Sequence, residues 1–256
     1  MKLLAEPGHP PFTSAHRGFS TAAPENTMSA LHAAWKTGAT VAEIDMRLSR
    51  DGELVLMHDS DLRRTTDGRG LLADKSWAEL RRLDAGRWFD ESFADERIPS
   101  LEEVLIWAKG KIGLLVELKN FPERDPRFVQ RLLALFHRLD AAEAAIIAGF
   151  DHPTLAEIHR REPAWPIQMI YYARLTDPVG AARACGAGFV SLEPEFCLAE
   201  DVATLHEAGI AALTTVHSLE DARAFHAMGI DFIEANDAGM LAMAVEEIAK
   251  DPAAAV

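Results

Sequence analysis

The feature of this sequence that most constrains its fold is a regular alternation of short apolar runs with stretches of helical periodicity. Eight of these runs are predicted to be parallel strands, at residues 12–16, 41–46, 113–117, 145–148, 167–170, 189–192, 211–215 and 232–234. A strand-helix-strand connection is almost always right-handed, which favours parallel pairing throughout. In a chain of 256 residues, eight such units predict a (β/α)₈ TIM barrel that occupies residues 1–256 as a single domain. The alternative is an open doubly wound sheet, but no glycine-rich phosphate loop follows the first strand.

One pair of runs departs from this alternation and predicts a hairpin after the second strand. Asp51-Gly52 separates the runs 44–48 and 54–57, and Asp-Gly between apolar residues is the strongest short-range signal for a hairpin turn. The residues that follow, about 60–97, are rich in Arg, Asp and Gly. We expect them to form a small insertion with its own apolar core, anchored by Trp77, Leu80, Leu83, Trp88 and Phe89.

The helix between the first two strands has a clear start. Asn26 or Thr27 is available to cap it, because short polar side chains accept hydrogen bonds from the first turn of a helix. Met28, Leu31 and Trp35 then recur at helical spacing. This spacing predicts that all three are core residues.

Composition and charge exclude several classes of function. A formal net charge of −14 argues against a nucleic-acid or anionic-membrane surface, since both need clustered Lys and Arg. The two cysteines, Cys185 and Cys197, lack metal-site spacing and are expected to be small apolar residues of a protein in a reducing compartment. Residues 1–12 contain too few apolar residues for a signal peptide or a membrane span. We therefore expect a cytoplasmic protein without stable membrane insertion, and no pattern indicates a particular oligomeric state.

Acidic residues at predicted strand ends point to a metal. Glu43 and Asp45 are two residues apart, so both side chains leave the same face of a strand, and adjacent carboxylates repel unless a cation lies between them. Glu117-Leu118-Lys119 ends the next parallel strand and adds a third carboxylate. A single Glu-x-Asp pair is more often a solvated face, but three converging carboxylates favour one Mg²⁺ or Ca²⁺ over Zn²⁺.

Two histidines fall at strand ends on the same side. His16 ends the first run, and His58 ends the returning arm of the hairpin. In a barrel, both lie at the C-terminal mouth with the three carboxylates and Lys119. A histidine near neutrality both accepts and donates protons, so this convergence predicts acid/base chemistry at the mouth.

Several short motifs, in order, resemble those of one known family. They are His16-Arg17-Gly18, Pro24-Glu25-Asn26-Thr27, Glu43-x-Asp45, Asp51-Gly52, His58-Asp59, Leu62-Arg63-Arg64-Thr65-Thr66 with Gly68 and Gly70, Ile98-Pro99-Ser100-Leu101-Glu102-Glu103, and Glu117-x-Lys119. Over residues of about 12–237 the chain resembles the glycerophosphodiester phosphodiesterases, in their bacterial cytoplasmic form. That family has a (β/α)₈ barrel with an insertion after the hairpin.

The resemblance implies an activity and a set of site residues. The activity is hydrolysis of a glycerophosphodiester, a small molecule of lipid and glycerol metabolism, to glycerol 3-phosphate and an alcohol. Attack by a neighbouring glycerol hydroxyl would give a cyclic phosphate, which the same two histidines would then hydrolyse. The implied roles are metal ligands for Glu43, Asp45 and Glu117, an acid/base pair for His16 and His58, and phosphate contacts for Arg17 and Lys119.

The second half of the chain departs from the family pattern at three places. They are Gly149-Phe150, Thr214-Thr215-Val216-His217 and Ala235-Asn236-Asp237-Ala238. We expect these positions to line the mouth and to alter substrate choice more than chemistry, and His217 to cap a helix or face solvent.

Two other functions are compatible with such a barrel. A lyase that resembles sphingomyelinase D would stop at the cyclic phosphate. A non-catalytic phosphodiester-binding barrel would lack at least one of the reactive groups, and none is missing.

Overall fold

A computed structural model describes residues 9–121 and 124–250. Within these residues, eight parallel strands close into a barrel, and β1 pairs with both β2 and β9. The barrel strands are β1 (Phe12–Ala15), β2 (Val41–Leu48), β4 (Gly113–Leu118), β5 (Ala145–Gly149), β6 (Ile167–Ile170), β7 (Phe189–Leu192), β8 (Ala211–Thr215) and β9 (Phe232–Ala235). The predicted (β/α)₈ barrel is thereby confirmed.

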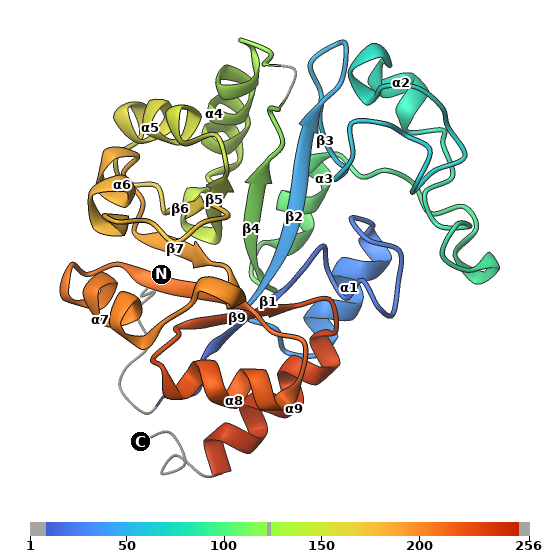
Figure 1. Cartoon of the computed structure of the whole chain (residues 1–256). Coiled ribbons are helices and arrows are strands. Elements are labelled where there is room, and N and C mark those ends of the chain that lie inside the picture. Colours follow the sequence, from blue (N-terminus) through green and yellow to red (C-terminus); the bar gives the residue numbers. More distant parts are fainter. Residues whose placement is uncertain (1–8, 122–123, 251–256) are drawn as a thin grey trace.

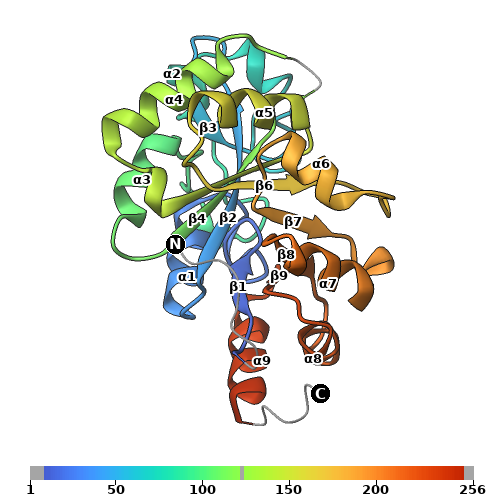
Figure 2. The same cartoon turned by 90° about the vertical axis from the view of Figure 1, so that its left-hand side faces the viewer.

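Helices follow the strands and surround the barrel (Figures 1 and 2). They are α1 (Met28–Lys36), α3 (Leu101–Ala108), α4 (Phe128–Leu139), α5 (His152–Arg161), α6 (Pro178–Ala184), α7 (Ala199–Glu207), α8 (Leu219–Ala227) and α9 (Ala238–Lys250). In the described part of the chain, no helix has both the length and the apolar character needed to cross a membrane. Of the N-terminal stretch interpreted above, residues 1–8 lie outside the described residues.

Two apolar layers fix which way each strand residue points. Ile44 and Met46 of β2 are fully buried in the large cluster between the sheet and the helices. A second cluster, which includes Leu115, Phe189 and Phe232, fills the inside of the barrel. Because neighbouring strand residues alternate in direction, Glu43, Asp45 and Arg47 point inward. The alternation therefore directs the carboxylates of β2 into the barrel.

The hairpin forms where Asp51-Gly52 predicts it. β2 pairs antiparallel with β3 (Leu54–Leu56), with Met46 opposite Leu56, and Gly52 has a φ of +89°. Residues 60–97, which include the short helix α2 (Trp77–Leu80), lie beside the barrel after this hairpin (Figure 1). Leu62, Leu72, Leu80 and Ala85 of this insertion form a separate apolar cluster with Val55 and Met57 of the hairpin arm and with Ile98.

Two aromatic residues predicted to be buried are at the surface. Trp35 is 41% exposed and Trp88 is 40% exposed. On α1 the buried face consists of Ala30, Leu31 and Ala34, and the two alanines allow the helix to lie close to the sheet. Trp35 is displaced to the edge of this face, so its predicted core position is wrong, as is that of Trp88.

Two other local predictions are confirmed. Thr27 is the N-cap of α1 and accepts a hydrogen bond from the backbone N–H of Ala30. Cys185 and Cys197 are buried free thiols that lie in the main apolar cluster, as expected for small apolar residues.

Candidate active site

Three carboxylates meet inside the mouth of the barrel. Glu43 and Asp45 come from β2 and Glu117 comes from β4, where Asp45 and Glu117 are register partners. One carboxylate oxygen from each lies within 4.8 Å of those of the other two. All three residues are buried. The structure thus brings together the three residues that the sequence predicted as metal ligands.

The chemistry of this cluster fits a divalent cation. Within the described part of the chain, the buried Glu43 Oε1 has no hydrogen-bond partner. Burial raises the pKa of Glu43 well above its usual range, and the charges of Asp45, Glu234 and Glu117 raise it further. Burial and the Asp45 charge also raise the pKa of Glu117. An oxygen-rich site that holds excess negative charge is suited to Mg²⁺ or Ca²⁺.

Asp45 is the most heavily contacted carboxylate of the three. Burial acts to raise its pKa, but the charges of Lys119, Arg17 and His58 and the hydrogen bond from Asn26 together lower it. Lys119 Nζ lies 3.1 Å from Asp45 Oδ1 and also hydrogen-bonds Glu117. The Asn26 side chain donates to Asp45 Oδ2 at 2.7 Å and accepts from the Asp45 backbone N–H at 3.0 Å. Asp45 is therefore held ionised and oriented by its neighbours.

Arg17 is anchored in the cluster by its backbone and its side chain. Its backbone N–H donates to Glu43 Oε2 at 2.7 Å, and its Nε lies 3.3 Å from Asp45 Oδ2. The residue has a φ of +59° and is followed by Gly18 with a φ of +79°. A Cβ at residue 18 would lie 2.7 Å from the carbonyl carbon of Ala30, so only glycine permits this turn.

His16 follows β1 and contacts Asn236, a residue near the other end of the sequence. Its Nδ1 lies 2.6 Å from Asn236 Oδ1, just after β9. With the amide oxygen as acceptor, Nδ1 carries the hydrogen, and Nε2 is the nitrogen left to react. Sequence reasoning placed Asn236 at the mouth without assigning it this role.

His58 is held at both its backbone and its ring. Its carbonyl oxygen accepts from Arg47 Nε at 2.9 Å and Nη2 at 2.6 Å. Its ring Nδ1 lies 2.7 Å from Asp59 Oδ1. Burial lowers the pKa of His58, against the opposing charge of Asp45. Burial thus favours the neutral form of the ring in the substrate-free protein.

Several residues of the site were not identified from the sequence. Asn26 had been considered as a helix cap and as part of a family motif but not as a contact of Asp45, and Glu234, which raises the pKa of Glu43, had been noted only as a strand residue. Ser14 Oγ donates to Glu234 Oε2 at 2.6 Å inside the barrel. The inward direction of alternate residues on β9 was the one signal that could have identified Glu234.

The departures in the second half occupy different environments. Thr214 is fully buried and donates to the carbonyl of Leu192 at 2.7 Å. Its neighbour Leu213 lies in the cluster inside the barrel, so Thr214 points toward the helices, and its predicted place at the mouth is wrong. Phe150 is 54% exposed, with Lys119 Nζ 5.9 Å from its ring centre. His217 faces solvent, and Ser218 is the residue that caps α8.

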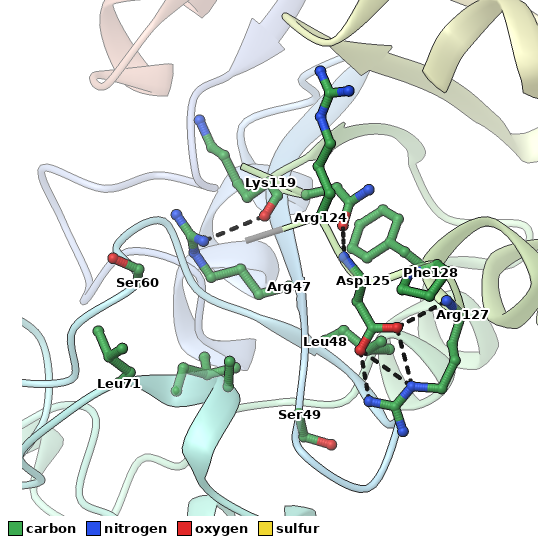
Figure 3. A pocket seen from close by; sticks show the side chains of 14 residues that line it. Arg47, Leu48, Ser49, Ser60, Leu71, Lys119, Arg124, Asp125, Arg127 and Phe128 are labelled. Carbon is green, nitrogen blue, oxygen red and sulfur yellow. Dashed lines mark hydrogen bonds and ion pairs between the residues drawn. The ribbon is translucent and has the colours of Figure 1, made fainter. Parts of the chain in front are cut away.

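A cavity of about 300 Å³ lies between the hairpin, the insertion and the segment after β4 (Figure 3). Arg47 and Lys119 are on its wall, and Leu71 of the insertion faces them. Arg47 Nη1 donates to the backbone carbonyl of Lys119 at 3.3 Å. The cavity is therefore lined by Arg47, which contacts the His58 carbonyl, and by Lys119, which contacts Asp45 and Glu117.

Fold and site together define a (β/α)₈-barrel enzyme with an acidic centre at the C-terminal face of its strands. A model of the glycerophosphoryl diester phosphodiesterase family matches residues 16–240. The chain belongs to this family and is a phosphoric diester hydrolase, which confirms the resemblance described above.

Curated relatives and a solved structure support the same family assignment. A glycerophosphodiester phosphodiesterase of Caldanaerobacter subterraneus is 37% identical over 165 residues, 64% of this chain and 68% of the relative. YhdW of Bacillus subtilis is 32% identical over 223 residues, 86% of this chain and 91% of YhdW. An Oleispira antarctica phosphodiesterase, solved in complex with the product sn-glycerol-3-phosphate, superposes with a TM-score of 0.85 at 27% identity and covers 92% of this chain and 97% of its own.

Proposed function

We propose that this chain hydrolyses glycerophosphodiesters to glycerol 3-phosphate and an alcohol, with one divalent cation, Mg²⁺ or Ca²⁺, held by Glu43, Asp45 and Glu117. The observation that carries the proposal is the convergence of these three buried carboxylates at one mouth with Lys119 and Arg17. The product bound to the Oleispira antarctica phosphodiesterase supports the choice of substrate. A cation bound here would withdraw charge from the phosphate oxygens.

In this proposal the chain's own cations bind the phosphate. Lys119 Nζ and the Arg17 guanidinium both face Asp45, so they lie beside the carboxylates, and Arg17 also pairs with Glu25. Fixed positive charges at the place where negative charge develops stabilise the transition state without reorganisation. Lys119 and Arg17 thereby orient the phosphate between the two histidines.

His16 and His58 are proposed to transfer the protons. They originate on separate elements, one after β1 and one after β3, and each presents a ring whose Nδ1 already has an acceptor. One Nε2 would take the proton of the attacking glycerol hydroxyl, and the other would protonate the departing alcohol. The two roles would reverse when water opens the cyclic phosphate.

The barrel and the insertion are proposed to act as one catalytic domain on a small-molecule substrate in the cytoplasm. The insertion packs its apolar residues beneath the catalytic hairpin, so it is continuous with the site. Two buried free thiols suit a reducing compartment. The net charge of −14 disfavours nucleic acid as a partner.

Product analysis tests this function directly. Purified enzyme is incubated with a panel of glycerophosphodiesters, with Mg²⁺, with Ca²⁺ or with EDTA, and glycerol 3-phosphate is measured enzymatically. Phosphorus NMR follows the same reactions. Release of glycerol 3-phosphate in the metal-containing samples is the expected outcome, whereas a cyclic phosphate that accumulates as the final product would establish a lyase instead.

Glu43→Gln is predicted to stabilise the metal-free protein. Glu43 has a folded-state pKa raised above the ordinary value of 4.5. Its contribution to stability is present below that ordinary value and is lost as pH rises through the folded pKa. At pH above the ordinary value, replacing this ionisable group should therefore raise the melting temperature of metal-free protein by about 2–4 °C, corresponding to about 1 kcal/mol.

The same substitution should abolish the stabilisation that metal gives to the wild type. Melting curves with EDTA and with Mg²⁺ or Ca²⁺ measure both effects. Glu195→Gln, which changes an exposed carboxylate, serves as the matched control and should alter neither. A metal-free Glu43→Gln protein that melts below the wild type would contradict this account of the cluster.

A further inference from the structure

An alternating series of acidic and basic side chains connects the carboxylate cluster to His58. Its members, in spatial order, are Asp45, Arg17, Glu25, Arg64, Asp59 and His58. Five of them lie on β2, in the connection from β1 to α1 or directly after β3, but Arg64 belongs to the insertion. The series therefore joins the insertion to both parts of the proposed reaction centre.

The half of the series nearest the carboxylates is well buried. Arg17 Nη1 donates to Glu25 Oε1 at 2.9 Å, and the Glu25 side chain is 12% exposed. Arg64 donates to both Glu25 oxygens, from Nη1 and Nη2, at 2.7 Å each. In spite of burial, these arginines lower the pKa of Glu25. Glu25 is thus an ionised bridge between two guanidinium groups.

The other half ends on the ring of His58. Arg64 Nε donates to Asp59 Oδ2 at 2.6 Å, and Arg64 Nη2 donates to Asp59 Oδ1 at 3.1 Å. The hydrogen bonds from Arg64 are the largest cause of the lowered pKa of Asp59. An ionised carboxylate only accepts hydrogen bonds, so His58 Nδ1 must donate to Asp59. This leaves Nε2 as the nitrogen that reacts with substrate.

The bidentate geometry of Arg64 gives this series a defined orientation. A partly exposed ion pair contributes little by itself, and the Arg64 side chain is 43% exposed. Here, however, one planar guanidinium makes a bidentate contact on each side, to Glu25 and to Asp59. Such forks fix orientation as well as charge, which a lysine ammonium cannot do.

We propose that Arg64 is a positioning residue for His58. Its guanidinium hydrogen-bonds both Glu25 and Asp59, and these bonds fix the tautomer of the His58 ring and its direction relative to the carboxylate cluster. This inference rests on the proposed function in one respect, that His58 takes part in proton transfer. It assigns to the insertion a role in the chemical step. Arg64 touches neither the cluster nor the substrate in this role, and it acts through Asp59.

Arg64→Met tests the proposal, and the neighbouring Arg63→Met is a matched control. Arg63 also pairs with a carboxylate of the insertion, Asp61, but its side chain is 71% exposed. We expect Arg64→Met to lower kcat by about 10–100-fold, as loss of an orienting contact typically does. Arg63→Met should stay within about twofold of the wild type in kcat and KM.

A double-mutant cycle separates positioning from a general structural role. In a His58→Ala background, Arg64→Met should cost less than about twofold, because an effect that acts through His58 disappears with it. These rates are measured as glycerol 3-phosphate release from a glycerophosphodiester, because a nitrophenyl leaving group needs little acid help and would hide an effect that acts through His58. Nitrogen-15 NMR of the His58 ring gives a second readout: the Nδ1-protonated tautomer should dominate in the wild type and in Arg63→Met, and be reduced in Arg64→Met.

Each outcome decides the matter. If Arg64→Met lowers kcat equally in both backgrounds, or leaves the His58 tautomer unchanged, the positioning role is overturned. If Arg64→Met does not fold, Arg64→Lys keeps the charge without the fork and must show the same tautomer change and a reduced kcat. If His58→Ala alone keeps full activity, it is the proposed function that fails, which the cycle reports independently of Arg64.

Discussion

Replacing His58 or His16 with alanine is expected to lower kcat by on the order of 10²-fold or more, the usual contribution of a positioned acid or base. The two rings come from separate elements, and each has its Nδ1 engaged, His16 by Asn236 and His58 by Asp59. Both therefore present Nε2 to the same mouth. The double substitution should cost much less than the product of the single effects, since the two groups act in one step.

An activated substrate assigns the two roles. A nitrophenyl phosphodiester has a good leaving group and needs little help from a general acid. It should restore the rate of the variant that lacks the acid and not of the variant that lacks the base. We expect rescue of His58→Ala, on the proposal that His58 lies on the side where the alcohol leaves. Rescue of both variants, or of neither, would show that this division of roles is wrong.

Removal of the divalent cation is expected to have the second large effect. Excess EDTA should abolish activity, and added Mg²⁺ or Ca²⁺ should restore it. Asp45→Asn and Glu117→Gln should each weaken metal binding measured by calorimetry, because each removes an anionic ligand from a three-carboxylate site. Asp45→Asn should be the more damaging, since Asp45 also holds Lys119 and Arg17 in place.

A surface carboxylate provides the control for these substitutions. Glu102 lies on α3 and pairs with Arg138, apart from the acidic cluster. Glu102→Gln should leave metal affinity and kcat unchanged. Full activity in excess EDTA, or equal effects of Glu102→Gln and Asp45→Asn, would rule out the proposed metal centre.

The sequence was sufficient for the fold because local patterns and topology agree. Alternating apolar runs and helices lead to few closed arrangements, and the Asp51-Gly52 turn marks the one antiparallel arm. It was also sufficient to bring Glu43, Asp45 and Glu117 together, because residues at the ends of neighbouring parallel strands must meet. The direction of each side chain followed from the alternation along the strand.

The failures have a physical cause as well. Helical spacing identifies an apolar stripe but not its edges, so Trp35 was placed in the core although alanines occupy the centre of that face. Contacts such as Arg64 with Glu25 and Asp59 depend on how a loop-rich insertion folds back on the barrel. The periodicity of the sequence does not predict how this insertion folds back on the barrel.

The closure of the barrel by β9 determines when the site can first exist. All seven proposed site residues lie before residue 120, yet Ser14 and His16 take hydrogen-bond partners 220 residues later, at Glu234 and Asn236. At ribosomal rates, on the order of 10 s separates synthesis of Lys119 from that of Asn236. During that interval the edge of β1 has no partner on the β9 side, and an unpaired edge invites aggregation. Maturation of the nascent enzyme therefore depends on its last strand, and a ribosome stalled before residue 232 would release a chain with its proposed catalytic residues but no closed barrel to hold them.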